Sequence, residues 1–274
     1  MTLKKTKTQQ DITNYRLSIQ ISLSGLSFCI LDKNTNNVTV LKDFKFEKKL
    51  NPLEVLDYLK HLFTTEATLN QTFSSVNVIH TNELSTLVAK DLFNEDCLAD
   101  YLKFNAKILK SDFIAYDTIN GHNMVNVYVP YVNINNFIYD TFGAFTYKHF
   151  STVLIENILS IEKNATELKV YVHVGINHFE IVATDQGKLL LYNTFDYKTK
   201  EDFIYYILFT FEQLKLDPET HRLVLLGNIS KDSELYDIAY KYIRHVGFGN
   251  RNSNHKLNEE SANKHANFII LNNF

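Results

Sequence analysis

Two stretches of the chain carry the same order of secondary-structure patterns, and this repeat constrains the fold more than any other feature. In each stretch, three short segments with period-two hydrophobic alternation are followed by a helix, a strand and further helix. The first copy predicts strands at 17–23, 26–31, 38–46 and 75–81, a helix at 52–63 and helical segments over 82–102. The second predicts strands at 168–174, 179–184, 188–195 and 222–226, and helices at 200–214 and 232–246. Two such copies are difficult to obtain by chance, although their sequence identity is low.

The segments outside the two copies complete this prediction. We expect a hairpin at 113–130, a helix at 133–142, a strand at 144–148, a helix at 150–161, a polar loop at 247–267 and a last strand for the second sheet at 268–271. Mixed sheets with one antiparallel edge and helices on both faces form three-layer α/β lobes. The sequence therefore predicts a mobile tail at 1–14, a first lobe at 15–161 and a second lobe at 167–274, with a cleft between the lobes.

Glycine and proline are scarce, and this bears on function. The 274 residues include 8 glycines and 3 prolines, 11 in all or about 4%, where about 12% is ordinary. Glycine-rich loops that cradle phosphate must therefore be few. The sequence contains no GxSxG elbow, no Walker loop and no Rossmann glycine fingerprint, so the common hydrolase and dehydrogenase classes lose their usual support.

Charge and cysteine content exclude further classes. The net charge is −3, from 28 basic and 31 acidic residues that are well mixed, so no broad field favours nucleic acid or an anionic membrane. No apolar run reaches the roughly 18 residues of a membrane span, and the basic start does not lead into a signal peptide. Cys29 and Cys97 are far apart in apolar surroundings, which predicts reduced thiols in a cytoplasmic protein.

The duplicated unit resembles the actin-like ATPase fold, in which two ribonuclease-H-like lobes are stacked, as in actin, hexokinase and a chaperone ATPase domain. Residues 124–159, with a strand ending at Pro130, a helix, Phe142-Gly143-Ala144 and then strand and helix, are similar to the pilus-assembly branch of that superfamily. Cell-division members are more distantly similar. As a whole, the chain is identified as a member of a bacterial family called domain of unknown function 3822, which carries no established activity.

The resemblance also implies where a nucleotide would bind. Active members carry an Asp-x-Gly motif in the first hairpin of each lobe, where the acid orients Mg²⁺ or water and the glycine lets the backbone reach phosphate. This chain has Ser22 and Ser24-Gly25 at the first motif, and His173 with Gly175 at the second. The paired glycines of the adenosine pattern correspond to Gly227 and Asn228. These residues form the candidate nucleotide cleft, with both catalytic acids missing.

Other candidate residues receive simpler interpretations. His173 and His178 lack the helical companion of an HExxH-like site, so no metal is expected there. Glu180 and Asp185 are predicted to be exposed strand and turn residues. The aromatic positions Tyr205, Tyr206, Phe209 and Phe211 cover several faces of one predicted helix, which indicates burial between lobes or subunits.

Three functional hypotheses follow. The leading one is a degenerate, non-catalytic member of the actin-like ATPase fold that acts through contacts with an unidentified protein, with self-association also open and with no cofactor. The first alternative is a divergent ATP-binding protein or kinase that places Mg²⁺ through other carboxylates in the cleft. The second is a ribonuclease-H-like nuclease, which would need a cluster of two or three acids on one sheet edge. Fold analogy alone does not choose among them.

Overall fold

The first sheet opens with an antiparallel meander and continues with parallel strands. A computed structural model describes residues 13–250, 255–256 and 265–274. The strand order is β3-β2-β1-β4-β8, and β1 pairs antiparallel with β2 but parallel with β4. The strands are β1 (Tyr15–Ile21), β2 (Gly25–Asp32), β3 (Asn37–Lys45), β4 (Ser75–His80) and β8 (Thr146–His149).

The second sheet repeats this arrangement. Its order is β11-β10-β9-β12-β13, with β9 antiparallel to β10 and parallel to β12. The strands are β9 (Lys169–Val174), β10 (His178–Asp185), β11 (Lys188–Asp196), β12 (Arg222–Gly227) and β13 (His245–Phe248). The duplicated meander predicted from the sequence is therefore confirmed.

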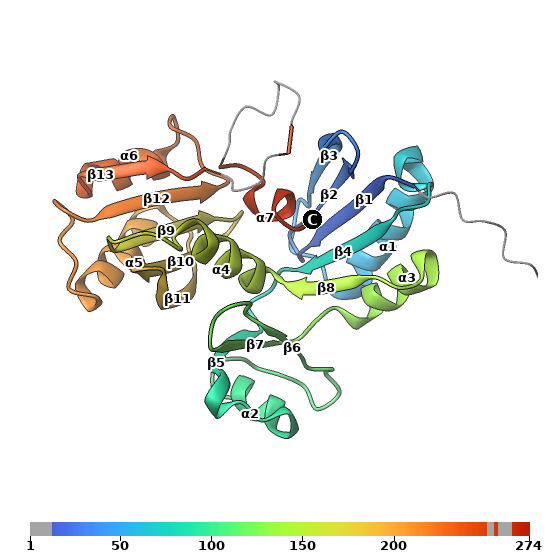
Figure 1. The fold of residues 1–274 in the computed structure, drawn as a ribbon, viewed down its shortest axis with the longest axis horizontal. Coiled ribbons are helices and arrows are strands. Elements are labelled where there is room, and N and C mark those ends of the chain that lie inside the picture. The colour runs from blue at the N-terminus through green and yellow to red at the C-terminus, as the bar shows by residue number, and fades with distance from the viewer. Residues whose placement is uncertain (1–12, 251–254, 257–264) are drawn as a thin grey trace, which may run out of the picture.

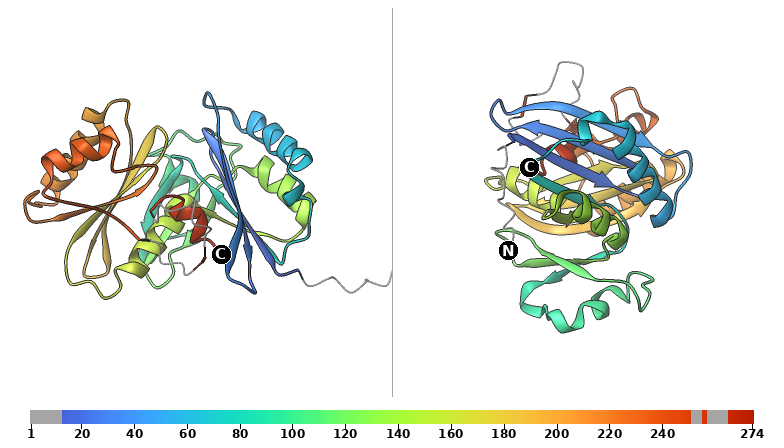
Figure 2. Two further views of the ribbon diagram at one scale, coloured as in Figure 1. Left: turned by 90° about the horizontal axis from the view of Figure 1, so that it is seen from above. Right: turned by 90° about the vertical axis from the view of Figure 1, so that its right-hand side faces the viewer.

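Helices cover both faces of each sheet (Figures 1 and 2). The outer face of the first sheet packs against α1 (Pro52–Thr65) and α3 (Val132–Phe142), and that of the second against α5 (Lys200–Gln213) and α6 (Glu234–Tyr242). Between the sheets lie α4 (Phe150–Ile161) and α7 (Phe268–Leu271), which share an apolar cluster with side chains from both sheets. The two layered units thus meet through a common core.

A small third unit is inserted between β4 and α3. It contains the sheet β5-β7-β6, formed by β5 (Ser85–Ala89), β6 (Ala115–Thr118) and β7 (Met124–Tyr128), with α2 (Leu98–Leu102) packed on it. Short 3₁₀ turns occur at Ala67–Leu69, Lys90–Leu92 and Glu95–Cys97. The predicted hairpin at 113–130 is confirmed. The helical prediction over 82–102 is wrong at β5, because this segment pairs with β7 about 40 residues later in the chain, which no local pattern reveals.

Two further predictions in the second half are wrong. The helix expected over 232–246 ends at Tyr242, and His245–Phe248 instead forms β13, parallel to β12. Residues 268–271 form α7 rather than a strand. A run of four apolar residues has no periodicity to separate strand from helix, and all four side chains are buried here. Moreover, α7 packs on β1 and β2 of the first sheet, so the lobe boundaries 15–161 and 167–274 stay a prediction.

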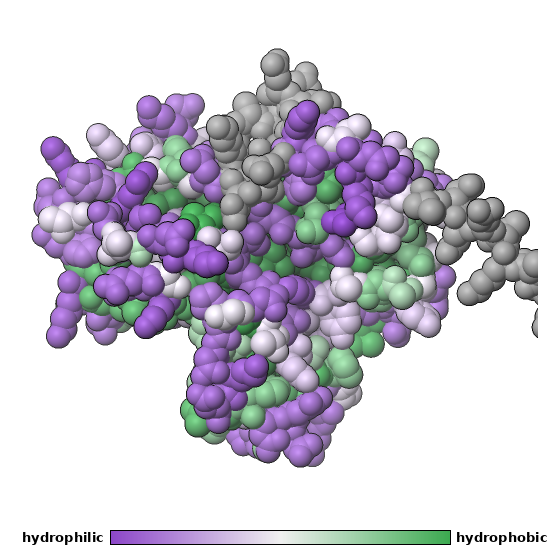
Figure 3. All heavy atoms as spheres, in the orientation of Figure 1, coloured by the Kyte–Doolittle hydropathy of each residue, from purple (hydrophilic) through white to green (hydrophobic). Residues whose placement is uncertain are grey.

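Several smaller features bear on the predictions. The predicted tail lies outside the described residues up to residue 12, as do 251–254 and 257–264 of the predicted loop; Lys256 of that loop hydrogen-bonds to the β3 segment. Cys29 is buried and Cys97 is half-buried. Among the described helices, none has the length and apolarity to cross a membrane. Hydrophilic residues predominate on the face shown in Figure 3, with hydrophobic residues in small patches.

Candidate functional site

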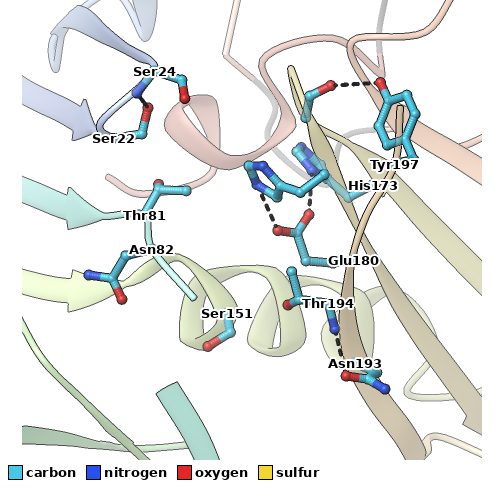
Figure 4. Close-up of polar contacts among 12 residues, drawn as sticks. Ser22, Ser24, Thr81, Asn82, Ser151, His173, Glu180, Asn193, Thr194 and Tyr197 are labelled. Atoms are coloured by element: carbon cyan, nitrogen blue, oxygen red, sulfur yellow. Dashed lines mark hydrogen bonds and ion pairs between the residues drawn. The ribbon is translucent and has the colours of Figure 1, made fainter. Parts of the chain in front are cut away.

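A cavity of about 300 Å³ lies between the two sheets, where the β1–β2 turn faces the β9–β10 turn across the start of α7. Figure 4 shows Ser22 and Ser24 on one side and His173 on the other. All seven residues singled out from the sequence line this cavity: Ser22, Ser24, Gly25, His173, Gly175, Gly227 and Asn228. The structure thus brings together positions that are up to 206 residues apart, counted from Ser22 to Asn228.

The Ser22 hydroxyl is engaged in holding the first turn. Its Oγ donates to the Gly25 carbonyl at 2.9 Å and accepts the Ser24 N–H at 3.2 Å. The Ser22 N–H also donates to the Gly25 carbonyl, at 3.0 Å. A hydroxyl used in this way fixes the conformation of the turn and is a poor substitute for a carboxylate, which would bring a negative charge to a cation.

Close packing of the backbone accounts for two of the cleft glycines. A Cβ at Gly25 would lie 2.7 Å from the Phe44 carbonyl oxygen on β3. Gly227 has φ of +80°, and a Cβ there would lie 2.5 Å from the Val174 carbonyl oxygen. Both glycines are therefore required by the fold, since side chains at these positions would collide with neighbouring backbone.

Behind the cavity wall, Glu180 lies between two histidines. Its Oε2 is 3.2 Å from His173 Nδ1 and its Oε1 is 3.2 Å from His178 Nε2 (Figure 4). The arrangement follows from strand register, because Glu180 on β10 is directly opposite His173 on β9. An ionised carboxylate only accepts hydrogen bonds, so each facing imidazole nitrogen carries its proton.

Electrostatics fixes the charge of this cluster. Burial favours the neutral acid, but the charge of His178 and the hydrogen bonds from both imidazoles outweigh it, and the pKa of Glu180 is lowered to about 2. Burial also acts to lower the pKa of His178, yet the Glu180 carboxylate raises it above the ordinary value. The cluster is thus an internally neutralised ion pair, and its carboxylate has little charge left for a cation in the cavity.

The cavity offers few groups that could hold a metal ion. Asp43 is the only carboxylate among the described residues that line it, and this side chain is exposed on β3. Across the described part of the chain, no three His, Cys, Asp or Glu residues are grouped so that they could hold a metal. Lys45 supplies positive charge to the lining, whereas His178 is paired with Glu180. The lining is therefore better suited to an anion or a neutral polar group than to Mg²⁺.

Sequence reasoning missed part of this site. Glu180 was predicted to be exposed and is only 2% exposed, because helices cover both faces of the second sheet and buried residues run continuously from Phe179 to Thr184. Asp185 lies at the predicted turn, half-buried. Of the aromatic residues on α5, Phe211 is buried in the core, whereas Tyr205 and Phe209 are exposed. A signal for the cluster existed in the pairing of two predicted strands, which places Glu180 near His173.

Comparisons with known proteins agree with this architecture. A family model described as "Protein of unknown function (DUF3822)" matches residues 4–246. A Bacteroides thetaiotaomicron protein described as having an actin-like ATPase fold and unknown function is 24% identical, with a TM-score of 0.77 over 93% of this chain and 98% of its own. PilM in a PilM–PilN type IV pilus biogenesis complex is 12% identical, with a TM-score of 0.60 over 90% and 91% of the two chains. No curated protein matches the sequence. The predicted actin-like ATPase fold is confirmed.

Proposed function

The chain belongs to the DUF3822 family, and from this membership and its actin-like ATPase fold we propose that it is a pseudo-ATPase, a non-catalytic protein that acts by binding another protein. One observation carries the proposal. At the two positions where the resemblance implies catalytic acids, the cavity has Ser22, which holds its own turn, and His173, which is bound to Glu180.

The chemistry of magnesium supports this proposal. Mg²⁺ in phosphate-transferring sites is held by one or two carboxylates together with substrate phosphates. Here the buried carboxylate of Glu180 is already compensated by two imidazoles, and Asp43 lies on the exposed surface of an edge strand. Glu180 therefore lacks the free charge to orient a metal ion between the two turns, and Asp43, which lines the cavity, is an exposed side chain.

A binding role has support of its own. PilM, which shares the fold, is described in a complex with PilN, so the architecture is compatible with partner binding. The described surface also carries exposed aromatic side chains, among them Phe104, which is 82% exposed, and Tyr205 and Tyr240, which are each 61% exposed. Aromatic side chains at the surface are enriched at protein interfaces.

The ATP-binding alternative keeps one favourable observation. The cavity between the sheets is open and its volume of about 300 Å³ is at the lower end of the range of about 300–1,000 Å³ for ligand pockets. The nuclease alternative has no such support, since no cluster of three acids or other metal ligands occurs within the described residues.

Thermal unfolding with and without MgATP tests the proposal. We expect the midpoint of the full chain to be the same in buffer and in millimolar MgATP. A nucleotide at 100 times its dissociation constant would add about 2.7 kcal/mol of stability, which corresponds to a rise of several degrees. Two controls, EDTA to remove magnesium and the variant Asp43→Asn, show whether a rise depends on a bound metal. A rise that disappears in either control would contradict the proposal.

A further inference from the structure

A second, larger groove separates the inserted unit from the second sheet. Its volume is about 920 Å³, near the upper end of the usual range for ligand sites. One wall is formed by Ser85, Thr86 and Leu87 of β5, and the opposite wall by Tyr192, Asn193 and Thr194 of β11. Both strands are edges of their sheets, so two strand edges line one groove.

The backbone of β5 presents hydrogen-bonding groups to this groove. Val129 N–H donates to the Leu84 carbonyl and Lys90 N–H donates to the Asn123 carbonyl, both at 3.0 Å. In an antiparallel pair, bonded and non-bonded residues alternate. Thr86 therefore bonds to β7, whereas the N–H and C=O groups of Ser85 and Leu87 point away from β7. Since β5 is the edge strand, those groups have no strand beside them.

The backbone of β11 presents hydrogen-bonding groups to the groove from the opposite side. Tyr197 N–H donates to the Asn177 carbonyl at 3.2 Å, so alternation turns the backbone groups of Tyr192 and Thr194 away from β10. A second observation agrees with this assignment. Thr194 N–H donates to the side-chain Oδ1 of Asn193 at 2.9 Å, as Figure 4 shows, instead of to a neighbouring strand.

The two ends of the groove differ chemically. At one end, Leu87 and Tyr192 pack in the same apolar cluster. At the other end are the carboxylates of Asp196 and of Glu83, whose Oε1 forms an exposed ion pair with Lys49 Nζ at 3.5 Å; both carboxylates are close enough to His178 to raise its pKa. β5 therefore runs from the acidic end of the groove to the apolar end, and β11 runs in the opposite direction.

From these observations we infer that the groove binds an extended segment of a partner protein as an added β-strand. The segment forms main-chain hydrogen bonds to the edges of β5 and β11, places an apolar side chain beside Leu87 and Tyr192, and places a basic side chain beside Glu83 and Asp196. Strand addition to an exposed edge gives affinity through the backbone and specificity through alternate side chains. The inference rests on the proposed function only in taking a protein as the partner.

The test uses a phage-displayed library of linear 12-residue peptides selected on the immobilised full chain. Enriched peptides are then synthesised and their affinities measured against the wild type and variants. Ser85→Pro removes an N–H that points into the groove and leaves the β5–β7 bonds in place. We expect it to weaken binding at least tenfold. Thr118→Pro is the matched control, because Thr118 is on β6, the other edge of the same sheet, with its N–H also pointing away from β7.

A second measurement keeps the test independent of how the proline variants fold. The backbone nitrogens of the selected peptide can be methylated in two alternate sets. Methylation of one set should abolish binding and methylation of the other should not, as expected for a paired strand. Charge reversal with Glu83→Lys should also weaken peptides that carry a basic residue.

Several outcomes would overturn the inference. These are a failure to enrich any peptide, equal binding to Ser85→Pro and wild type, or insensitivity of the peptide to N-methylation. The inference would also be overturned if the wild-type chain forms a dimer and Ser85→Pro dissociates it, because a second copy would then cover the groove. A nucleotide-binding result in the cavity would defeat the proposed function but would leave these peptide results unchanged, so the two failures can be told apart.

Discussion

At the residue scale, several residues between the two sheets serve the protein's own structure. Ser22 bonds to its own turn, Gly25 and Gly227 make room for neighbouring carbonyls, and Glu180 is paired with His178 and hydrogen-bonded to His173. A buried carboxylate paired with two imidazoles is costly to disturb, because removal of one partner leaves a buried charge uncompensated. The cluster is therefore explained as a structural link between β9 and β10.

The titration of His178 tests this explanation. Burial alone acts to lower the pKa of His178, and the Glu180 carboxylate is the main group that raises it. In Glu180→Gln, the pKa of His178 should therefore fall below its ordinary value, as followed by NMR of the imidazole protons. The exposed Glu83 contributes least, so Glu83→Gln is a control expected to cause a smaller change. Equal changes in the two variants would contradict the assigned pair.

A second pair of histidines should make the protein sensitive to acid. Burial lowers the pKa of His80 to about 4 and that of His149 to about 3, from an ordinary value of 6.5. As pH falls below 6.5, the unfolded chain takes up protons that the folded chain refuses. Stability should then fall by about 1.4 kcal/mol per pH unit for each group, until about pH 4.

Urea unfolding at pH 7.0 and at pH 5.0 measures this effect. His149→Gln should lose less stability between the two pH values than the wild type, whereas replacement of the exposed His61 by Gln should leave the difference unchanged. Equal losses of stability in His149→Gln and in the wild type between pH 7.0 and 5.0 would contradict a buried neutral imidazole at His149.

At the element scale, local signals and distant pairing account for what could and could not be predicted. The helix α1 was predicted from Asn51, Pro52 and Glu54, and the structure shows the capping box that these residues form. In contrast, β5 and β13 are strands that pair with partners distant in the sequence, and α7 is a short helix buried between the sheets. Periodicity within a short window carries no information about such contacts.

The helix α7 offers the sharpest test at this scale. Ile270 is 1% exposed and packs against the first sheet, so Ile270→Ala should cost about 2–5 kcal/mol in the free energy of unfolding. Ile176 is 39% exposed, and Ile176→Ala should cost far less. Urea denaturation of the two variants gives both values. Similar costs would contradict the packing of Ile270 against the first sheet.

At the scale of the whole molecule, duplication explains how the cavity arises. Two sheets with the same strand order face each other, so the equivalent turns after β1 and β9 meet on either side of α7. That symmetry is why seven residues chosen from the sequence converge on one cavity. Glu180 was missed because its role depends on the partner opposite it in the sheet. The actin-like ATPase architecture is thus present in this chain.

The most direct test of the central claim is the release of inorganic phosphate from MgATP by the purified full chain. We predict that the rate equals that of buffer alone, for the wild type and for Asp43→Asn, because the one carboxylate among the described residues that line the cavity is the exposed Asp43. Steady phosphate release that grows with protein concentration and is lost in Asp43→Asn would contradict this account and identify the protein as a working ATPase.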